Sequence, residues 1–400
     1  MERIIAVGAG QAGASLVAKL RSLGFAGEIT LIGAEPLPPY QRPPLSKAYL
    51  LGEMALERLF LRPESFYAEQ GVELRLGQQV SAIDCAARTV TLGDETLRYD
   101  ALALTTGSVP RRLPATIGGA LAGVHVVRDL ADVDAMAPEF QPRRRVVIVG
   151  GGYIGLEAAA VAAKKGLCVT VLEMAPRILQ RVAAPETSEA IRALHQSHGV
   201  DIREGTGLAR ITGETRVDGV ELSDGTRLAA DFVIAGIGIL PATALAEAAG
   251  LTLDNGIAVD AQGRTSDPQI WAAGDCASFP WRGMRLRLES VQNAIDQAEL
   301  VAENMLGAGM DYAPVPWFWS DQYDLKLQIA GLNTGYDRVI VRAGEARSHW
   351  YYAGEKFLAV DALGDPRAYM VGKRLLEAGR SPPPDAVADT KTDLKSLLKA

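Results

Sequence analysis

The chain has 400 residues, which suits two or three domains, and 48% of them are hydrophobic, as expected for a globular protein rather than a disordered or fibrous one. Its 41 basic and 48 acidic residues give a formal net charge of −7, which argues against nucleic-acid binding because that requires a basic face. Three scattered cysteines without a CxxC pair argue against a disulfide framework or a zinc site. We therefore expect no metal and a reducing, cytoplasmic location.

Two apolar stretches do not predict membrane segments. Residues 232–246 are shorter than the roughly twenty residues that a span needs, and they contain a proline. The first twenty residues carry a glycine pattern that has another explanation than a signal peptide. We expect no membrane association.

A strand, a glycine loop and a helix open the chain, and the series occurs twice. The β-branched run at 3–7 predicts a buried parallel strand; GAGQAG follows, and then a helical pattern that ends at Gly24. A second strand, EITLIG, completes a βαβ unit. RVVIV, GGGYIG, a helical pattern and CVTVLE repeat the series. Gly8 and Gly150 are 142 residues apart, as are Gly24 and Gly166, so one unit is repeated at a constant offset.

Each repeat places a GxGxxG motif between a strand and a helix. In such a motif the first glycine makes the turn, the second lets the backbone approach a pyrophosphate, and the third lets helix and strand pack closely. Free N–H groups at the helix N-terminus then bind the pyrophosphate. Two units predict two dinucleotides, the arrangement of a flavin enzyme supplied by a nicotinamide. The predicted cofactor-binding glycines are Gly8, Gly10, Gly13, Gly150, Gly152 and Gly155.

Acidic residues near the ends of the second strands distinguish the two cofactors. Glu173 lies eighteen residues beyond Gly155, where a carboxylate accepts hydrogen bonds from an adenosine ribose and repels the 2′-phosphate of NADP. We therefore predict NAD at the second repeat. In the first repeat Ala34 stands where an acid is expected, so we assign the FAD ribose contact to Glu35, with another group as the alternative.

Three later segments fit the same arrangement. DALALTTGSVP (100–110) predicts a strand, a turn and a proline where the chain leaves the first domain, and DFVIAGIGILP (231–241) repeats this pattern. TSDPQIWAAGDC (265–276) predicts an apolar strand that ends near Asp275. We expect the Asp275 carboxylate to accept a ribityl hydroxyl of the flavin.

Two further motifs, PPLSK (43–47) and PWFWSDQY (316–323), are narrower than the glycine loops. With GAGQAG, VVIVGGGYIGLE, LESVQNA and TSDPQIWAAGDC, they make the chain resemble, along essentially its whole length, the NADH-dependent, FAD-containing ferredoxin reductases of oxygenase systems.

The repeats and prolines predict an α/β fold of two Rossmann-like dinucleotide-binding domains with a small C-terminal α+β domain. We expect an FAD-binding domain at 1–110 and 243–315, an NAD-binding domain at 111–242, and an interface domain at 316–400. In the last of these, strand-like alternation predicts a small sheet, followed by a Pro-rich linker and an amphipathic terminal segment.

The resemblance implies roles for individual residues. Pro44 would pack by the isoalloxazine ring and Lys47 would point toward its N5 edge, while Glu157 would lie near the nicotinamide amide. Lys47 and Glu157 are thus the candidate catalytic residues. Trp319 would lie close to the flavin on the ferredoxin side. The remaining implied contacts are Ala12, Arg42, Val80, Thr106, Gly107, Arg128 and Val291 for FAD, and Tyr153, Ile154 and Gly238 for NAD.

The resemblance also implies the reaction and its partners. NADH would give a hydride to FAD, and single electrons would pass to a [2Fe-2S] ferredoxin that feeds a P450 or another oxygenase. The four histidines lie in no catalytic motif. An acidic chain needs a local basic face to bind an acidic ferredoxin; the candidates are Arg62, Arg282, Arg285, Arg287 and Lys326.

Two other classes use the same scaffold. Disulfide reductases and NADH oxidases place a reactive cysteine beside the flavin, whereas the segments after both glycine motifs lack cysteine. Cys276, next to Asp275, is typical of a small buried packing residue. The other alternative is a redox-signalling flavoprotein that resembles apoptosis-inducing factor.

Overall fold

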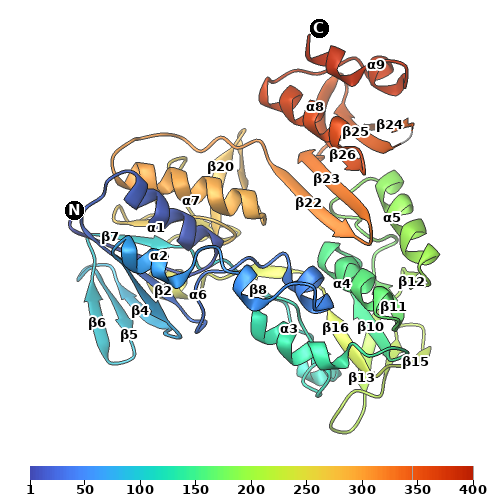
Figure 1. Cartoon of the computed structure of the whole chain (residues 1–400), viewed down its shortest axis with the longest axis horizontal. Coiled ribbons are helices and arrows are strands. Elements are labelled where there is room, and N and C mark those ends of the chain that lie inside the picture. Colours follow the sequence, from blue (N-terminus) through green and yellow to red (C-terminus); the bar gives the residue numbers. More distant parts are fainter. Residues whose placement is uncertain (345, 400) are drawn as a thin grey trace. The chain divides into compact units, whose positions relative to one another are not determined.

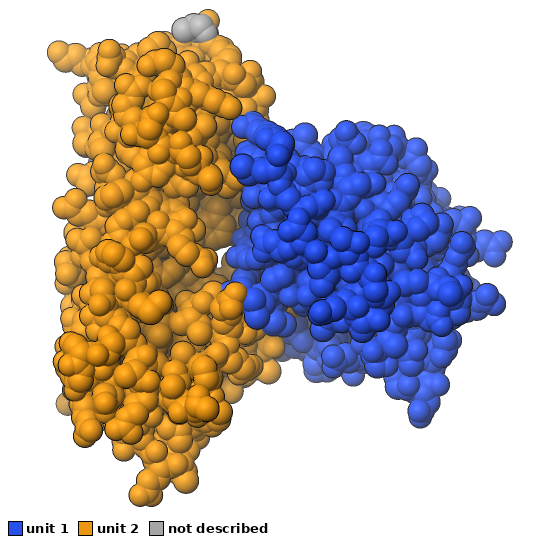
Figure 2. All heavy atoms as spheres, turned by 180° about the vertical axis from the view of Figure 1, so that it is seen from behind, with its two compact units in different colours: residues 1–41, 55–109, 239–314 blue, residues 42–54, 110–238, 315–400 orange. Residues whose placement is uncertain are grey.

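The computed structural model describes residues 1–344 and 346–399, and the chain forms two compact units, coloured blue and orange in Figure 2. No helix in this described part is long and apolar enough to cross a membrane. Unit 1 consists of Met1–Gln41, Ala55–Val109 and Ile239–Pro314; unit 2 consists of Arg42–Met54, Pro110–Gly238 and Val315–Ala400.

A five-stranded parallel sheet forms the centre of unit 1 (Figure 1). Its strands, in spatial order, are β19 (Ile270–Ala272), β7 (Ala101–Leu104), β1 (Arg3–Val7), β2 (Glu28–Gly33) and β3 (Val72–Leu76). The apolar run of β1 is buried because both faces of the sheet are covered. Side chains of helices α1 (Gln11–Ser22) and α7 (Val291–Met305) pack on one face.

The other face of this sheet packs against smaller elements of unit 1. They include an antiparallel sheet of β4 (Val80–Asp84), β5 (Thr89–Leu92) and β6 (Glu95–Arg98). They also include a mixed sheet of β18 (Ile257–Ala258), β20 (Ala277–Trp281) and β21 (Met284–Leu286), in which β18 is parallel and β21 antiparallel to β20. The remaining elements around this unit are α2 (Glu64–Glu69), α6 (Ala244–Ala248), η2 (Leu56–Arg58), β8 (Ser108–Pro110) and β17 (Ile239–Pro241).

Unit 2 contains a second parallel sheet with the same plan. Its strands, in spatial order, are β12 (Asp201–Glu204), β11 (Cys168–Glu173), β10 (Arg145–Val149), β16 (Phe232–Ala235) and β9 (Val124–His125). Strand β10 and helix α4 (Tyr153–Lys164) begin 142 residues after β1 and α1, which confirms the predicted repeat. Also in this unit are η1 (Leu45–Tyr49), η3 (Ala115–Ile117), α3 (Leu130–Met136), η4 (Ala137–Glu139) and α5 (Pro185–Ser197).

The repeat is larger than the sequence pattern indicates. After β3 in unit 1 and after β12 in unit 2, the chain forms an antiparallel three-stranded meander and then returns to the central sheet. The meander is β4-β5-β6 in unit 1, and in unit 2 it consists of β13 (Leu208–Thr212), β14 (Gly219–Leu222) and β15 (Arg227–Ala229). Together the two parallel sheets confirm the predicted α/β class with two Rossmann-like halves.

The last part of unit 2 is a five-stranded antiparallel sheet with helices, which confirms the predicted α+β segment. Its strands, in spatial order, are β22 (Trp317–Gln322), β23 (Leu325–Gly331), β26 (Lys356–Leu363), β25 (Arg347–Ala353) and β24 (Arg338–Ala343). Helices α8 (Pro366–Glu377), α9 (Pro384–Ala388) and the 3₁₀ turn η5 (Leu394–Leu398) follow.

Candidate active site

The first glycine loop joins the carboxyl end of β1 to the amino end of α1. Gly8 has a φ of +116°, and a Cβ there would lie 2.2 Å from the carbonyl oxygen of Thr105. A Cβ on Gly13 would lie 2.1 Å from the carbonyl oxygen of Gly8. At Gly10, the N-cap of α1, a Cβ would meet no atom of the described residues within 4 Å. The outer glycines are therefore required by the fold, whereas the middle one leaves open space.

The second glycine loop repeats this construction between β10 and α4. Gly150 has a φ of +109°, and a Cβ there would lie 2.3 Å from the carbonyl oxygen of Gly236. A Cβ on Gly155 would lie 2.2 Å from that of Gly150, whereas Gly152 again has open space among the described residues. In the part of the chain that the structure describes, no side chain caps α1 or α4. Uncapped N–H groups behind an open glycine fit a pyrophosphate at both helices.

One of the two predicted ribose-binding acids contacts its glycine loop. Glu173, at the end of β11, accepts hydrogen bonds from the backbone N–H groups of Gly151 and Ala175, both at 2.8 Å. These bonds hold its carboxylate against the glycine loop. Glu35 follows β2, and its carboxylate accepts a hydrogen bond from the Tyr40 hydroxyl.

The other unit 1 candidates include a carboxylate at the end of β19. Asp275 accepts a hydrogen bond from the Ser108 hydroxyl at 2.9 Å. Its neighbour Gly274 packs against the first turn of α1, since a Cβ there would lie 3.1 Å from the Cβ of Ala12. The structure therefore brings Asp275 and Ala12 close together. Among the remaining candidates, the Thr106 hydroxyl donates to the carbonyl oxygen of Ala242 at 2.7 Å, and Gly107 has a φ of +68°. The Val80 side chain is buried, and Val291 is half-buried.

The two candidate catalytic residues form a buried ion pair in unit 2. The Nζ atom of Lys47 lies 2.7 Å from Oε2 of Glu157, and their side chains are 19% and 6% exposed. Ser46 donates to the same oxygen at 3.0 Å, and Ser320 donates to Oε1 at 2.8 Å. Sequence reasoning did not single out Ser46 or Ser320. Both lie inside the two narrow motifs, which was the available signal.

The remaining unit 2 candidates lie around the segment that carries Lys47 or at the start of α4. Arg42 donates from Nη1 to the carbonyl oxygen of Arg128 at 2.9 Å, which ties the start of the PPLSK segment to the turn before α3. Tyr153 packs against Phe318 with ring centroids 4.9 Å apart. Its hydroxyl is buried and has no hydrogen-bond partner among the described residues, and burial raises its pKa well above the ordinary value. Of the others, Pro44 and Trp319 are half-buried, and Ile154 and Gly238 are exposed.

Two of the five predicted docking residues make structural hydrogen bonds. The Arg287 side chain is 10% exposed; it pairs with Glu289 and donates to the Asp275 carbonyl. Arg285 donates to the carbonyl oxygens of Ser278 and Val259. Internal partners therefore take up most of the Arg287 guanidinium and part of the Arg285 guanidinium, which leaves less of their charge for the predicted docking face. The other three, Arg62, Arg282 and Lys326, are exposed.

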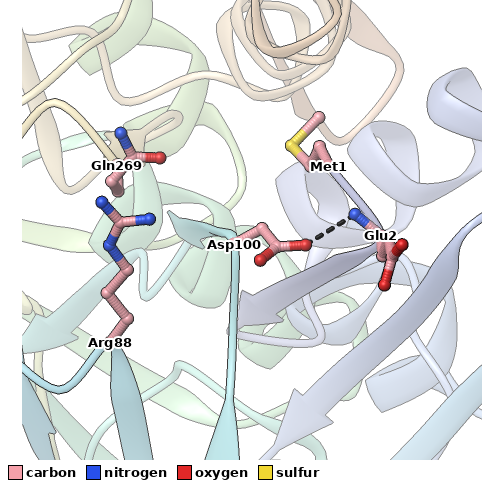
Figure 3. Close-up of a pocket in the computed structure, with 5 residues that line it drawn as sticks. All are labelled: Met1, Glu2, Arg88, Asp100 and Gln269. Atoms are coloured by element: carbon pink, nitrogen blue, oxygen red, sulfur yellow. Dashed lines mark hydrogen bonds between the residues drawn. The ribbon is translucent and has the colours of Figure 1, made fainter.

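A shallow depression in unit 1 is a separate feature (Figure 3). It is lined by Met1, Glu2, Arg88, Asp100 and Gln269, and the Glu2 N–H donates to the Asp100 carboxylate at 2.6 Å. Three of these residues directly precede β1, β7 and β19, so the depression lies at the amino ends of the strands. Ligands of parallel sheets bind at the carboxyl ends, so we assign it no cofactor.

Similar proteins account for nearly the whole chain. Residues 2–298 match the family described as pyridine nucleotide-disulphide oxidoreductase, and residues 317–398 match the one described as reductase C-terminal. A ferredoxin–NAD(P)(+) reductase of Sphingomonas sp is 45% identical over 404 residues, which cover 99% of this chain and 97% of the relative. Putidaredoxin reductase of Pseudomonas putida is 42% identical over 410 residues, which cover 100% of this chain and 97% of the relative.

The fold comparison agrees with the sequence comparison. A chain in the crystal structure of the covalent putidaredoxin reductase–putidaredoxin complex matches with a TM-score of 0.96 and 40% identity, over 100% of this chain and 98% of that one. The family match spans both glycine loops and both predicted ribose-binding acids. This chain belongs to the pyridine nucleotide-disulphide oxidoreductase family, with a reductase C-terminal domain.

Proposed function

We propose that this protein is an NADH-dependent, FAD-containing reductase that passes single electrons to a [2Fe-2S] ferredoxin of a P450 or other oxygenase system. The observation that carries the proposal is the pair of uncapped helix N-termini, each behind a glycine loop with an open middle position. Two such loops fit two dinucleotides, and the full-length relatives named above reduce ferredoxins. The most direct test is reduction of a purified [2Fe-2S] ferredoxin with NADH as the only donor.

The residues of unit 1 hold one dinucleotide. N–H groups of the first turn of α1 bind its pyrophosphate, Glu35 accepts from its ribose, and the Asp275 carboxylate accepts from a ribityl hydroxyl. FAD, when bound, takes two electrons as a hydride and releases them one at a time.

The residues of unit 2 bind and orient the nicotinamide substrate. The first turn of α4 binds its pyrophosphate and Glu173 its ribose. Lys47, held by Glu157, supplies a cation where negative charge develops during hydride transfer, so the protein contributes positioning and electrostatics rather than a nucleophile.

We also assign the domains and the compartment. The FAD-binding domain takes 1–110 and 243–315, the NAD-binding domain 111–242, and the interface domain 316–400. All three cysteines are free, which supports a reducing cytoplasm.

The thiol chemistry of disulfide reductases and NADH oxidases is a poor fit. Cys276 is fully buried, and burial raises the pKa of its thiol, so the reactive thiolate is disfavoured. We expect the number of titratable thiols in the denatured protein to be the same before and after reduction by NADH. An additional pair of thiols after reduction would indicate a redox-active disulfide.

The other alternative, a signalling flavoprotein, differs in its turnover. Slow turnover with every ferredoxin offered would favour that class.

Replacing Glu173 should change the choice of nicotinamide. Glu173→Arg removes a ribose acceptor and the repulsion of a 2′-phosphate, and a hydrogen bond to a charged group contributes about 1.5–3 kcal/mol. We expect the kcat/KM ratio of NADH to NADPH to fall roughly ten- to a hundredfold. Glu214→Arg, a change at an exposed position of the same unit, is the matched control. An unchanged ratio in Glu173→Arg would remove this residue from the ribose site.

The ferredoxin interface should depend on salt. Contacts between exposed charges are screened over about 8 Å at physiological ionic strength. We expect ferredoxin reduction by NADH to fall severalfold from low to physiological salt, and reduction of a neutral quinone to change little. Arg282→Glu should reproduce this loss at low salt, because Arg282 is exposed, stacks on Trp281 and has no acidic partner among the residues that the structure describes. An equal salt response of both activities would place the interface elsewhere.

A further inference from the structure

A chain of hydrogen bonds extends from the Lys47–Glu157 pair toward α5. Ser320, on β22, donates to Oε1 of Glu157, and Nε2 of Gln322, two residues further on this strand, lies 3.1 Å from the Ser320 Oγ. Oε1 of Gln322 lies 2.8 Å from Nε2 of His195, which α5 supplies. All five residues belong to unit 2, so three distant segments of sequence meet in one connected group.

This group is closed to water over most of its length. Ser320, Gln322 and His195 are each at most 1% exposed, and Glu157 is 5% exposed. Residues two apart on a strand point to the same face, which is why Ser320 and Gln322 both belong to the group. Buried polar atoms must find partners within the protein, so each of these bonds constrains the next.

The carboxylate at one end decides the direction of every bond. A carboxylate only accepts, so the Ser320 hydroxyl must donate to Glu157 and must accept from the amide nitrogen of Gln322. The amide oxygen of Gln322 then faces His195, which must carry its proton on Nε2. In a neutral imidazole this leaves Nδ1 as an acceptor, and the Tyr323 hydroxyl, 3.1 Å away, donates to it. Burial lowers the pKa of His195 to about 4, so the ring is neutral at pH 7.

Ser320 binds a different oxygen of the Glu157 carboxylate from the one that Ser46 and Lys47 bind. Ser46 and Lys47 both bind Oε2, whereas Oε1 is bound by Ser320. The rotation of the carboxylate about its last bond is therefore fixed by Ser320 at one oxygen and by Ser46 and Lys47 at the other. Gln322 and His195 in turn hold the Ser320 hydroxyl in place, because Gln322 donates to its oxygen and His195 donates to Gln322.

We propose that Gln322 and His195 are positioning residues for the Lys47–Glu157 pair in hydride transfer. This role rests on the proposed function, in which Lys47 and Glu157 act at the flavin. The alternative is that the group only ties the C-terminal sheet to α5 and contributes stability. The two readings differ in whether a break at Gln322 slows hydride transfer without unfolding. Both require the bond directions derived above, which are tested by whether a change at Glu157 alters the tautomer of His195.

The tautomer of His195 is the first test. In protein labelled with ¹⁵N-histidine, only four imidazoles contribute signals, and His195→Gln identifies the one in question. We expect a proton on Nε2 and none on Nδ1. Glu157→Gln can donate to Ser320 and so reverse the direction of the bonds, and we expect the Nδ1-protonated form of His195 to appear. A Nδ1–H tautomer in the unaltered protein, or identical His195 signals in Glu157→Gln, would overturn the proposal.

Stopped-flow bleaching of the flavin by NADH is the second test. Gln322→Leu removes the side-chain amide, which supplies both the donor to Ser320 and the acceptor for His195, and we expect the limiting rate to fall about tenfold with little change in the dissociation constant of NADH. His195→Gln keeps an N–H group for Gln322 and should retain most of the rate. His198→Ala is the matched control, because His198 lies outside this group. Its ring stacks on that of Tyr323, with the ring centroids 3.7 Å apart. An unchanged rate in a folded Gln322→Leu, or an equal loss in His198→Ala, would refute a positioning role.

The two tests separate failure of this inference from failure of the proposed function. If Gln322→Leu does not fold, Gln322→Met replaces it in the rate measurement, and the His195 signals in Glu157→Gln still test the bond directions, since that change preserves the shape of the side chain. If NADH bleaches the flavin but no ferredoxin is reduced, the proposed function fails while the tautomer result stands.

Discussion

Lys47→Ala should slow the reduction of bound FAD by NADH by roughly 10²–10³-fold, the loss expected when a positioned electrostatic contact is removed from an active site. The change removes the cation that pairs with the Glu157 carboxylate. The buried carboxylate then keeps only the hydroxyl groups of Ser46 and Ser320 as the hydrogen-bond donors described above. If the pair acts at the flavin as proposed, a buried carboxylate without its cation would repel the developing negative charge, so both losses would act in the same direction. Stopped-flow bleaching of the oxidised flavin band measures the rate.

The control for this change is another paired lysine. Lys373→Ala removes a surface ion pair with Glu377 on α8, and we expect the wild-type rate. FAD content and thermal unfolding should be measured for both variants, so that a slow rate is assigned only to folded, flavin-loaded protein. A wild-type rate in such a Lys47→Ala protein would make Lys47 an ordinary loop residue.

Gly10→Ala and Gly152→Ala should separate the two dinucleotide sites. Both residues have open space at the Cβ position and φ angles of −95° and −83° that alanine adopts readily, so neither change should strain the fold. The added methyl group occupies the approach of a pyrophosphate to the backbone. We expect Gly10→Ala to be purified without FAD. We expect Gly152→Ala to keep FAD but to lose at least a hundredfold in kcat/KM for NADH, since a misplacement of about 1 Å costs this much.

Two further glycines define the controls for these variants. Gly207→Ala, whose Cβ would meet Ser223 at an ordinary 3.6 Å, should change neither FAD content nor NADH use. Gly155→Ala, whose Cβ would lie 2.2 Å from a carbonyl oxygen, should instead lower the unfolding temperature. Full FAD content in Gly10→Ala, or normal NADH kinetics in Gly152→Ala, would contradict the assignment of that loop to a dinucleotide.

Features that depend on neighbouring residues could be predicted from the sequence alone. The GxGxxG loops, the strand before each and the helix after each lie within about twenty residues, and turn, packing and helix N-terminus are local consequences of those residues. The repeat was visible because GAGQAG and GGGYIG stand at a constant offset. The meanders that extend the repeat were not recognised, because short antiparallel strands such as β13 and β15 have little sequence pattern of their own.

Contacts between residues far apart in the sequence became known from the packing of the folded chain. The resemblance implied separate roles for Lys47 and Glu157, whereas the fold joins them in one ion pair that Ser320 completes. His195 lay in no motif, and its part in the buried group depends on the packing of α5 against β22. Contacts of this kind are set by the assembly of whole sheets, because a buried polar atom takes whichever partner the packing of the backbone brings within reach. No spacing along the chain encodes that partner.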